Sequence, residues 1–222
     1  MAWDEAWETV FRAQEWGRYP AEDLVRFVAR NFYRVPDRGA VQLLEVGCGP
    51  GGNLWYMARE GFTVAGIDGS STAVELAKNR LDAEVPGWRG EIVCGDMTTL
   101  PFADGRFDGV VDSEAIYCNS FGDSKRIYNE VRRVLKPGGA LFSRTFAAGS
   151  HGDGTGDQIG RSYWRTAEGP ATGKGLCRFT SRDDISELLD GFSIEALGLL
   201  SRSARGSDDH AVKEWLITAR RL

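Results

Sequence analysis

The sequence predicts an α/β fold in which helices cover both faces of a mostly parallel sheet. Three observations lead to this prediction: short apolar runs alternate with amphipathic helical patterns, a glycine-rich loop follows the first run, and two strand-like runs end the chain. Strands that alternate with helices form right-handed crossovers and pair in parallel. Two adjacent strands with a short connector pair antiparallel.

The first 40 residues predict an N-terminal cap of two helices. Trp3, Trp7 and Phe11 recur at helical spacing. After Pro20, four further apolar residues repeat this spacing: Leu24, Phe27, Val28 and Phe32. We interpret the first aromatic stripe as a packing surface rather than a substrate cage.

Residues 41–146 carry the alternating pattern of the predicted sheet. Predicted strands cover Val41–Val46, Thr63–Ile67, Glu91–Cys94, Gly109–Val111 and Ala140–Thr145. Predicted helices cover Asn53–Arg59, Ser71–Leu81 and Ser124–Leu135. The last helix is expected to end where Pro and Gly follow, in the run Lys136-Pro137-Gly138-Gly139.

The rest of the chain divides into two parts. Residues 147–179 are glycine-rich and show little periodicity, as lids, binding loops or disordered segments do. Residues 180–222 predict a helix that begins near Thr180 and then two strands, Phe192–Leu200 and Ala211–Ala219, joined by the polar turn Ser201–His210. No repeat or linker divides the chain, so residues 1–222 are expected to form one domain.

Composition and charge exclude several classes of protein. With 27 Lys and Arg against 32 Asp and Glu, the formal charge is -5, so nucleic acid is not an expected partner. No apolar run approaches the roughly 18 residues of a membrane span, and the first residues lack the pattern of a signal peptide. Four dispersed cysteines and two histidines exclude zinc-finger spacing. We expect a cytoplasmic protein with no metal, and the oligomeric state stays open.

The clearest motif is the glycine-rich loop in Leu43-Leu-Glu-Val-Gly-Cys-Gly-Pro-Gly-Gly-Asn53, between the first predicted strand and the next helix. Glycine allows positive φ and lets a ligand approach the backbone closely. Read as GxGxxG, the spacing of Gly47, Gly49 and Gly52 is also compatible with a dinucleotide site.

Three carboxylates mark the carboxyl ends of the first three predicted strands, where open α/β sheets bind ligands. Glu45 lies at the end of the first strand, Asp68 ends the second, and Asp96 follows the third beside Met97. Beyond the fourth predicted strand, Asp112 and Glu114 either are solvated or line the site.

In these motifs the chain resembles the class I S-adenosylmethionine-dependent methyltransferases, in particular the branch that methylates small molecules. The likeness rests on the ExGxGxG motif from Glu45, on Asp68, on Gly95-Asp96-Met97 and on Val134-Leu-Lys-Pro-Gly-Gly139. It implies a Rossmann-like seven-stranded mostly parallel sheet with an antiparallel last strand. It also implies S-adenosyl-L-methionine as cofactor, S-adenosyl-L-homocysteine as product and a small-molecule acceptor.

The resemblance also assigns roles to individual residues. The methionine portion of the cofactor would lie beside the Glu45 carboxylate and be lined by Gly47, Gly49 and Gly51. Asp68 would hold the ribose. Further along the edge, Asp96 would receive the adenine amino group, Met97 would pack on the ring, and the backbone of Ser113 would contact the methionine amine.

Recognition of the acceptor must come from residues outside these motifs. The stretch from Arg144 to Arg182 holds six basic and three acidic residues, so a lid formed by residues 147–179 could hold a carboxylate or phosphate. A solvated loop is the alternative. Candidate acceptor-binding residues are Arg18, Tyr19, Tyr117, Arg161 and Arg165, and His151 is a candidate general base.

Three other functions remain compatible with the sequence. A nicotinamide-dependent oxidoreductase would use the same glycine loop but has no evident need for Asp96. A non-catalytic scaffold would need none of the three carboxylates. A methyltransferase acting on RNA or protein is less favoured because of the acidic balance and the absence of a basic appended domain.

Overall fold

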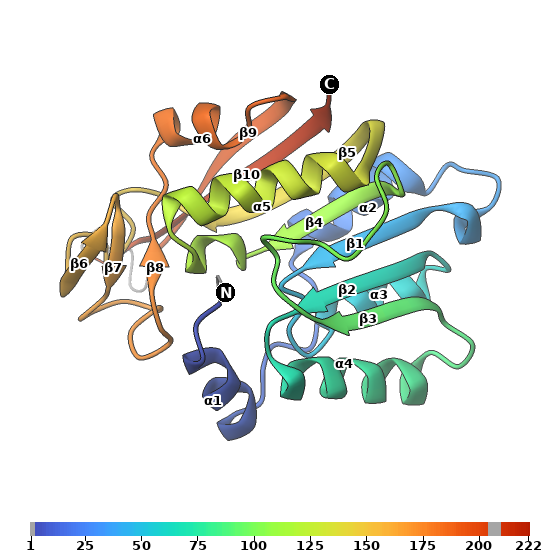
Figure 1. Ribbon diagram of the computed structural model, residues 1–222, viewed down its shortest axis with the longest axis horizontal. Helices are drawn as coiled ribbons and strands as arrows, with labels where there is room; N and C mark the ends of the chain where they lie inside the picture. The colour runs from blue at the N-terminus through green and yellow to red at the C-terminus, as the bar shows by residue number, and fades with distance from the viewer. Residues whose placement is uncertain (1–2, 204–209) are drawn as a thin grey trace.

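The protein is built around one seven-stranded sheet, as the sequence predicts (Figure 1). The computed structural model describes residues 3–203 and 210–222, and residues 204–209 of the predicted last turn lie outside this part. The strand order is β3-β2-β1-β4-β5-β10-β9. The first five strands of this order pair in parallel, and β10 is antiparallel to both of its neighbours, β5 and β9. The bounds of the strands are β1 Gln42–Val46, β2 Thr63–Asp68, β3 Arg89–Cys94, β4 Phe107–Ser113, β5 Leu135–Phe146, β9 Phe192–Arg202 and β10 Val212–Arg221.

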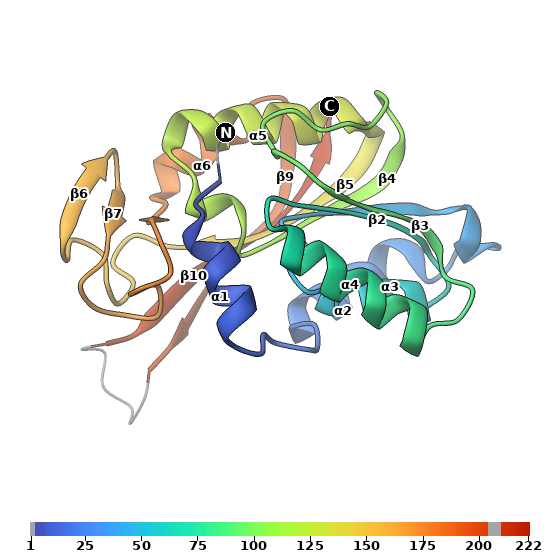
Figure 2. The ribbon, with the colours of Figure 1, turned by 60° about the horizontal axis from the view of Figure 1, so that its bottom comes forward.

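Helices cover both faces of this sheet. Apolar side chains of α5 and α6 pack on one face, and those of α2, α3 and α4 pack on the other. Helix α1 instead lies between α4 and a small sheet in both views of the ribbon (Figure 2). The bounds are α1 Ala6–Ala13, α2 Glu22–Phe32, α3 Gly52–Arg59, α4 Ser71–Glu84, α5 Phe121–Val134 and α6 Arg182–Leu188, with short 3-10 helices η1 Arg38–Ala40 and η2 Ile116–Cys118.

Helix starts follow local capping chemistry. The Ser70 side chain accepts the backbone N–H of Ala73, and Ser120 accepts that of Asp123. Because Ser120 is this cap, α5 begins three residues before the predicted Ser124. Ser181 and Asp184 form a reciprocal capping box at the start of α6. No helix in residues 3–203 and 210–222 is long and apolar enough to cross a bilayer.

The glycine-rich segment 147–179 is more ordered than the sequence suggests. It forms a separate antiparallel sheet of three short strands, β6 Asp157–Gly160, β7 Tyr163–Arg165 and β8 Cys177–Arg178. Its inner residues Cys177 and Phe179 join Tyr117 and Phe146 in a small apolar cluster. The strands are too short for a period-2 pattern, which explains why periodicity did not reveal them.

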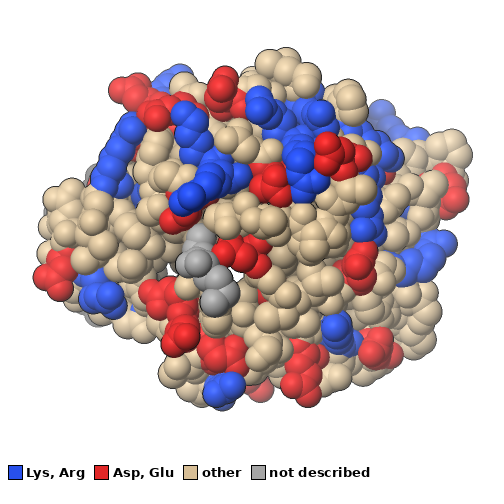
Figure 3. Space-filling view, viewed as in Figure 1, with Lys and Arg blue, Asp and Glu red and all other residues tan. Residues whose placement is uncertain are grey.

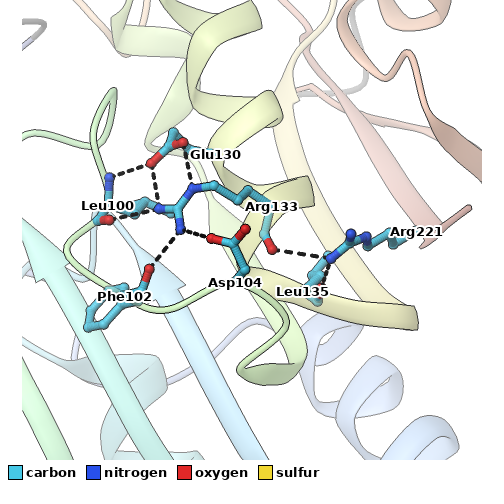
Figure 4. A network of polar contacts seen from close by, with 7 residues as sticks. All are labelled: Leu100, Phe102, Asp104, Glu130, Arg133, Leu135 and Arg221. Carbon is cyan, nitrogen blue, oxygen red and sulfur yellow. Dashed lines mark hydrogen bonds and ion pairs between the residues drawn. The ribbon is translucent and has the colours of Figure 1, made fainter.

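A network around Arg133 attaches the loop between β3 and β4 to α5 (Figure 4). The guanidinium donates to the carbonyls of Leu100 (2.9 Å) and Phe102 (2.8 Å) and to the Asp104 carboxylate (2.6 Å). Glu130 accepts from Arg133 at 2.9 Å and from the Leu100 backbone N–H at 2.8 Å. These bonds hold Leu100 and Phe102 in the core on the α5 side of the sheet.

Charges of both signs are interspersed on the face drawn in Figure 3. This face therefore presents no broad surface of one sign. The expectation that nucleic acid is not a partner stays a prediction.

Candidate ligand site

A cavity of about 250 Å³ lies at the carboxyl edge of the parallel strands. Its wall includes Glu45 and Gly47 from β1 and its loop, Asp68 at the end of β2, and Ser113 at the end of β4. The cavity thus lies at the edge where the sequence predicts a ligand site.

The glycine loop has the backbone geometry that the motif requires. Gly47, Gly49 and Gly51 have φ of +66°, +49° and +80°. A Cβ on Gly47 would lie 2.2 Å from the Ala115 Cβ, and one on Gly51 would lie 2.9 Å from the Ala77 Cβ. Gly47 and Gly49 line the cavity, whereas Gly51 packs against α4 and is not among the lining residues.

Glu45 is the buried carboxyl group nearest this loop in sequence, and it is 2% exposed. Its Oε1 accepts a hydrogen bond of 2.6 Å from Asn53, but its Oε2 has no hydrogen-bond partner among the described residues. Burial, only partly offset by the Asn53 bond, raises the pKa of Glu45 to about 8. The side chain therefore offers an unsatisfied acceptor at the wall of the cavity.

Asp68 connects the second strand to the glycine loop. Its Oδ2 accepts the Gly49 backbone N–H at 2.8 Å, and its Oδ1 accepts the Ser70 N–H at 2.9 Å. Burial raises the pKa of this carboxyl group, although the backbone bonds oppose the rise. Asp68 thus fixes the loop, while Ser70 caps α4, and each carboxylate oxygen keeps a lone pair for a further donor.

The third strand end is only partly exposed to the cavity. Met97 lines it, but Asp96 is not among the lining residues. The Asp96 Oδ1 accepts from the Thr98 backbone N–H (2.9 Å) and hydroxyl (2.7 Å), which is the geometry of a local turn. Its assignment to the adenine amino group stays a prediction.

The aromatic stripe of the N-terminal segment lines the cavity, which corrects its interpretation as packing surface alone. Trp3, Trp7 and Phe11 form the wall together with Trp16, and the Trp7 and Trp16 rings meet edge to face. Helix α1 is attached to the start of α4 because Glu8 accepts hydrogen bonds from the hydroxyls of Ser70 and Thr72. Helical spacing cannot tell a wall of a cavity from a core contact, because both bury the same stripe.

The fourth strand end carries a carboxyl group that sequence reasoning left unassigned. Glu114 lines the cavity and has φ of +60°, a strained value for a residue with a side chain. The turn that holds it is fixed by Asp112, which is fully buried and accepts the backbone N–H groups of Ala115 (3.1 Å) and Ile116 (3.0 Å). Asp112 is therefore neither solvated nor at the wall, whereas Glu114 is at the wall.

Glu114 belongs to a charge network built on the buried side chains of Arg144 and Glu214. The Arg144 guanidinium lies 3.0 Å from Glu114 and donates to Glu214 at 3.0 and 2.7 Å, and Arg202 also donates to Glu214 at 2.6 Å. Burial and a hydrogen bond with Glu214 raise the pKa of Glu114 to about 8. Burial opposes the ionisation of Glu214, but its bonds with Glu114 and Arg144 outweigh this and hold its pKa below the usual value. Glu214 is thus the anion of the pair, and Glu114 holds the proton at neutral pH.

The structure brings only some of the predicted acceptor-binding residues to this wall. Tyr19 and Tyr117 line the cavity. Arg18, in contrast, donates to Glu84 at 2.6 Å, and Arg161 pairs with Asp184 and Glu187. Arg165 lies in β7, outside the wall.

No residue of the fully described segment 147–179 is among the lining residues, so the geometry gives no support for this segment as a lid. This includes His151, the predicted base, whose imidazole contacts His210 and Glu168 instead.

Comparisons with known proteins agree with this geometry. A family model described as a methyltransferase domain matches residues 43–139. A phthiotriol/phenolphthiotriol dimycocerosates methyltransferase of Mycobacterium tuberculosis is 39% identical over 105 residues, which are 46% of this chain and 37% of that protein. A malonyl-[acyl-carrier protein] O-methyltransferase of Enterobacter lignolyticus is 31% identical over 170 residues, which are 76% of this chain and 61% of that protein.

The fold is shared with solved structures. The structure of a SAM-dependent methyltransferase from Methanosarcina mazei superposes on this chain with a TM-score of 0.65 and a sequence identity of 24%. The superposition covers 86% of this chain and 95% of the Methanosarcina mazei chain. The chain spans 37% and 61% of the lengths of the two curated relatives described above.

Proposed function

This chain belongs to the class I S-adenosylmethionine-dependent methyltransferases, and from this membership we propose that it catalyses methyl transfer to a small-molecule acceptor. The observation that supports the activity most directly is the convergence of Glu45, Gly47, Asp68 and Ser113 on one cavity at the carboxyl edge of the sheet. None of these residues requires the alternative function that the sequence left open, a nicotinamide-dependent oxidoreductase.

The wall of the cavity fits the cofactor of this family. The unsatisfied Oε2 of Glu45 suits the ammonium group of the methionine portion, because a buried carboxylate needs a charged or hydrogen-bonding partner. Gly47 and Gly49 line the cavity without a side chain that would occupy its space, and Asp68 would hold the ribose hydroxyls. Met97 would pack on the adenine ring, and the Ser113 backbone would contact the methionine amine.

When bound, S-adenosylmethionine supplies an electrophilic methyl group, so the chain itself must position the acceptor, exclude water and remove a proton where the acceptor carries one. We propose Glu114 as the acid-base group for this last task. Its carboxyl group lies in the wall, and Arg144 and Glu214 hold it in place. With a pKa of about 8, Glu114 is mostly protonated at neutral pH, and its ionised form, which accepts a proton from a hydroxyl or an ammonium group, becomes the major one above about pH 8.

The wall favours an acceptor with an apolar or aromatic body and little negative charge. Trp3, Trp7, Phe11 and Trp16 offer flat apolar surface. Arg144 is the one Lys or Arg among the described lining residues, and Glu114 and Glu214 already pair with it.

A carboxylate or phosphate on the acceptor therefore remains a prediction with a direct test. Because Arg161 and Arg165 lie outside the wall, substituting both by Ala should leave KM unchanged for acidic and neutral acceptors alike. A higher KM for an acidic acceptor alone would instead support the lid formed by residues 147–179.

A methyl-transfer screen tests the activity. Purified protein is incubated with cofactor labelled in its methyl group and with fractionated metabolite pools, and labelled product is identified by mass spectrometry. Gly47→Ala is the matched inactive control. Titration calorimetry with S-adenosylhomocysteine and with NAD, side by side, tests the cofactor. Binding of NAD alone would refute the proposal.

A further inference from the structure

The two histidines of this chain lie side by side although 59 residues separate them in the sequence. The Nε2 of His151 is 3.2 Å from the Nδ1 of His210, and the ring centroids are 4.5 Å apart. The Oε2 of Glu168 is 3.8 Å from the same Nε2 of His151. The three ligand-type atoms lie within 4.8 Å of one another, outside the cavity described above.

The backbone around these residues holds them together. The His151 N–H donates to the Ala211 carbonyl at 2.8 Å, next to His210. Two glycines let the His151 and Glu168 segments touch: a Cβ on Gly152 would lie 2.6 Å from the Glu168 carbonyl oxygen, and one on Gly169 would lie 2.4 Å from that of His151. These two glycines of segment 147–179 thus have a structural purpose, because they allow this close approach.

We propose that His151, His210 and Glu168 form a binding site for a divalent first-row transition cation such as Zn²⁺. Two facing imidazole nitrogens and a carboxylate oxygen are ligands that such cations prefer. Around a tetrahedral zinc ion with Zn–N bonds of about 2.0–2.1 Å, two nitrogen ligands lie about 3.3–3.4 Å apart. The observed 3.2 Å between the two ring nitrogens is close to this spacing, and the exposed Glu168 carboxylate lies nearby, 3.8 Å from the Nε2 of His151.

The site has a structural rather than a catalytic purpose. It joins the loop after β5, the segment after β7 and the residue that leads into β10, and none of its three ligands lines the ligand cavity. A cation here would fasten the small β6–β8 sheet to the edge of the main sheet. The expectation from sequence that the chain holds no metal arose because two lone histidines, 59 residues apart, show no ligand spacing.

Untagged protein, freed of metal by a chelator and dialysed, tests the proposal. Titration with Zn²⁺ should show one saturable site, and Co²⁺ should give a visible absorption band that Zn²⁺ abolishes. At a free Zn²⁺ concentration of about 100 times Kd, the melting temperature should rise by about 5–10 °C.

Variants assign the site to these side chains. His210→Ala, at an exposed position, should weaken Zn²⁺ binding at least tenfold, and Glu168→Gln should weaken it less. Without metal, both variants should have the same melting temperature as the metal-free parent. This comparison distinguishes the loss of a metal ligand from a loss of folding stability. Asp157→Ala in β6 and Cys94→Ser, at an exposed free thiol, are controls that should keep the parent's affinity. Absence of binding by the parent, or unchanged affinity in His210→Ala, would overturn the proposal.

Discussion

The pKa of Glu45 makes a quantitative prediction about cofactor binding. This buried carboxyl group has a pKa of about 8, and one of its oxygens has no hydrogen-bond partner among the described residues. If the ammonium group of the cofactor binds the ionised form, the proton must leave before the ligand binds. Apparent affinity then scales with the ionised fraction of Glu45.

The size of the effect follows from that pKa. The ionised fraction is about one-hundredth at pH 6 and about one half at pH 8, so S-adenosylhomocysteine should bind about 50-fold more tightly at pH 8 than at pH 6. This corresponds to about 2 kcal/mol of binding free energy. Above about pH 8 the dependence on Glu45 should level off.

Titration calorimetry from pH 6 to pH 9 measures this dependence, with Glu45→Gln as the matched variant. The ligand titrates identically in both proteins, so the ratio of their affinities isolates Glu45. A thioadenosine that lacks the amino-acid portion should have the same pH profile of affinity in the parent and in Glu45→Gln. Equal pH profiles for the parent and Glu45→Gln would refute the reasoning.

Rising pH should change protein stability in the direction opposite to its effect on cofactor affinity. This stability effect gives a second measurement on the same variant. The folded state binds a proton at Glu45 more tightly than the unfolded state, whose pKa is near 4.5. The stability of the parent should therefore fall as pH rises between these two values and level off above the folded-state pKa. Glu45→Gln should lack this loss and be the more stable protein at pH 9 in urea unfolding.

Three further substitutions test the site and the fold. Gly47→Ala should abolish binding of S-adenosylhomocysteine in calorimetry, because the added Cβ would lie 2.2 Å from the Ala115 side chain. Gly105→Ala is the control, because Gly105 has a similar φ of +61° but open space around it. This control should keep the affinity and lower the free energy of unfolding by about 1–2 kcal/mol. Glu114→Gln should lower kcat at least tenfold and remove the limb of the pH–rate profile near pH 8; an unchanged profile would exclude it as the acid-base group. Arg133→Ala should lower the free energy of unfolding by about 2–3 kcal/mol, because it leaves buried carbonyls without donors. Arg126→Ala on the same helix, which loses one exposed ion pair, should cost less than about 0.5 kcal/mol in the same urea titration, and equal losses would contradict the role of the network.

Much of the fold could be read from the sequence because its signals are local. The alternation of strands and helices predicted the order of elements, and the polar turn predicted the antiparallel end of the sheet, which β10 confirms. The glycine loop and the carboxylates Glu45 and Asp68 were identified by their spacing along strands that end at one edge. That edge is common to all parallel strands, so position in sequence predicts position in space.

Other features depend on contacts between segments far apart in the chain, which periodicity does not encode. The aromatic stripe lines the cavity because Glu8 attaches α1 to α4. Arg161, although basic and near the predicted lid, is held by the carboxylates of α6.

By itself, the sequence determined the fold class, the glycine loop and two of the carboxylates beside it, because these follow from local spacing. Only the tertiary structure decided which side chains complete the cavity, that burial raises the pKa of Glu114, and that His151 meets His210. Each of these depends on packing that brings distant residues within a few ångströms, and burial there, rather than residue type, sets their chemistry.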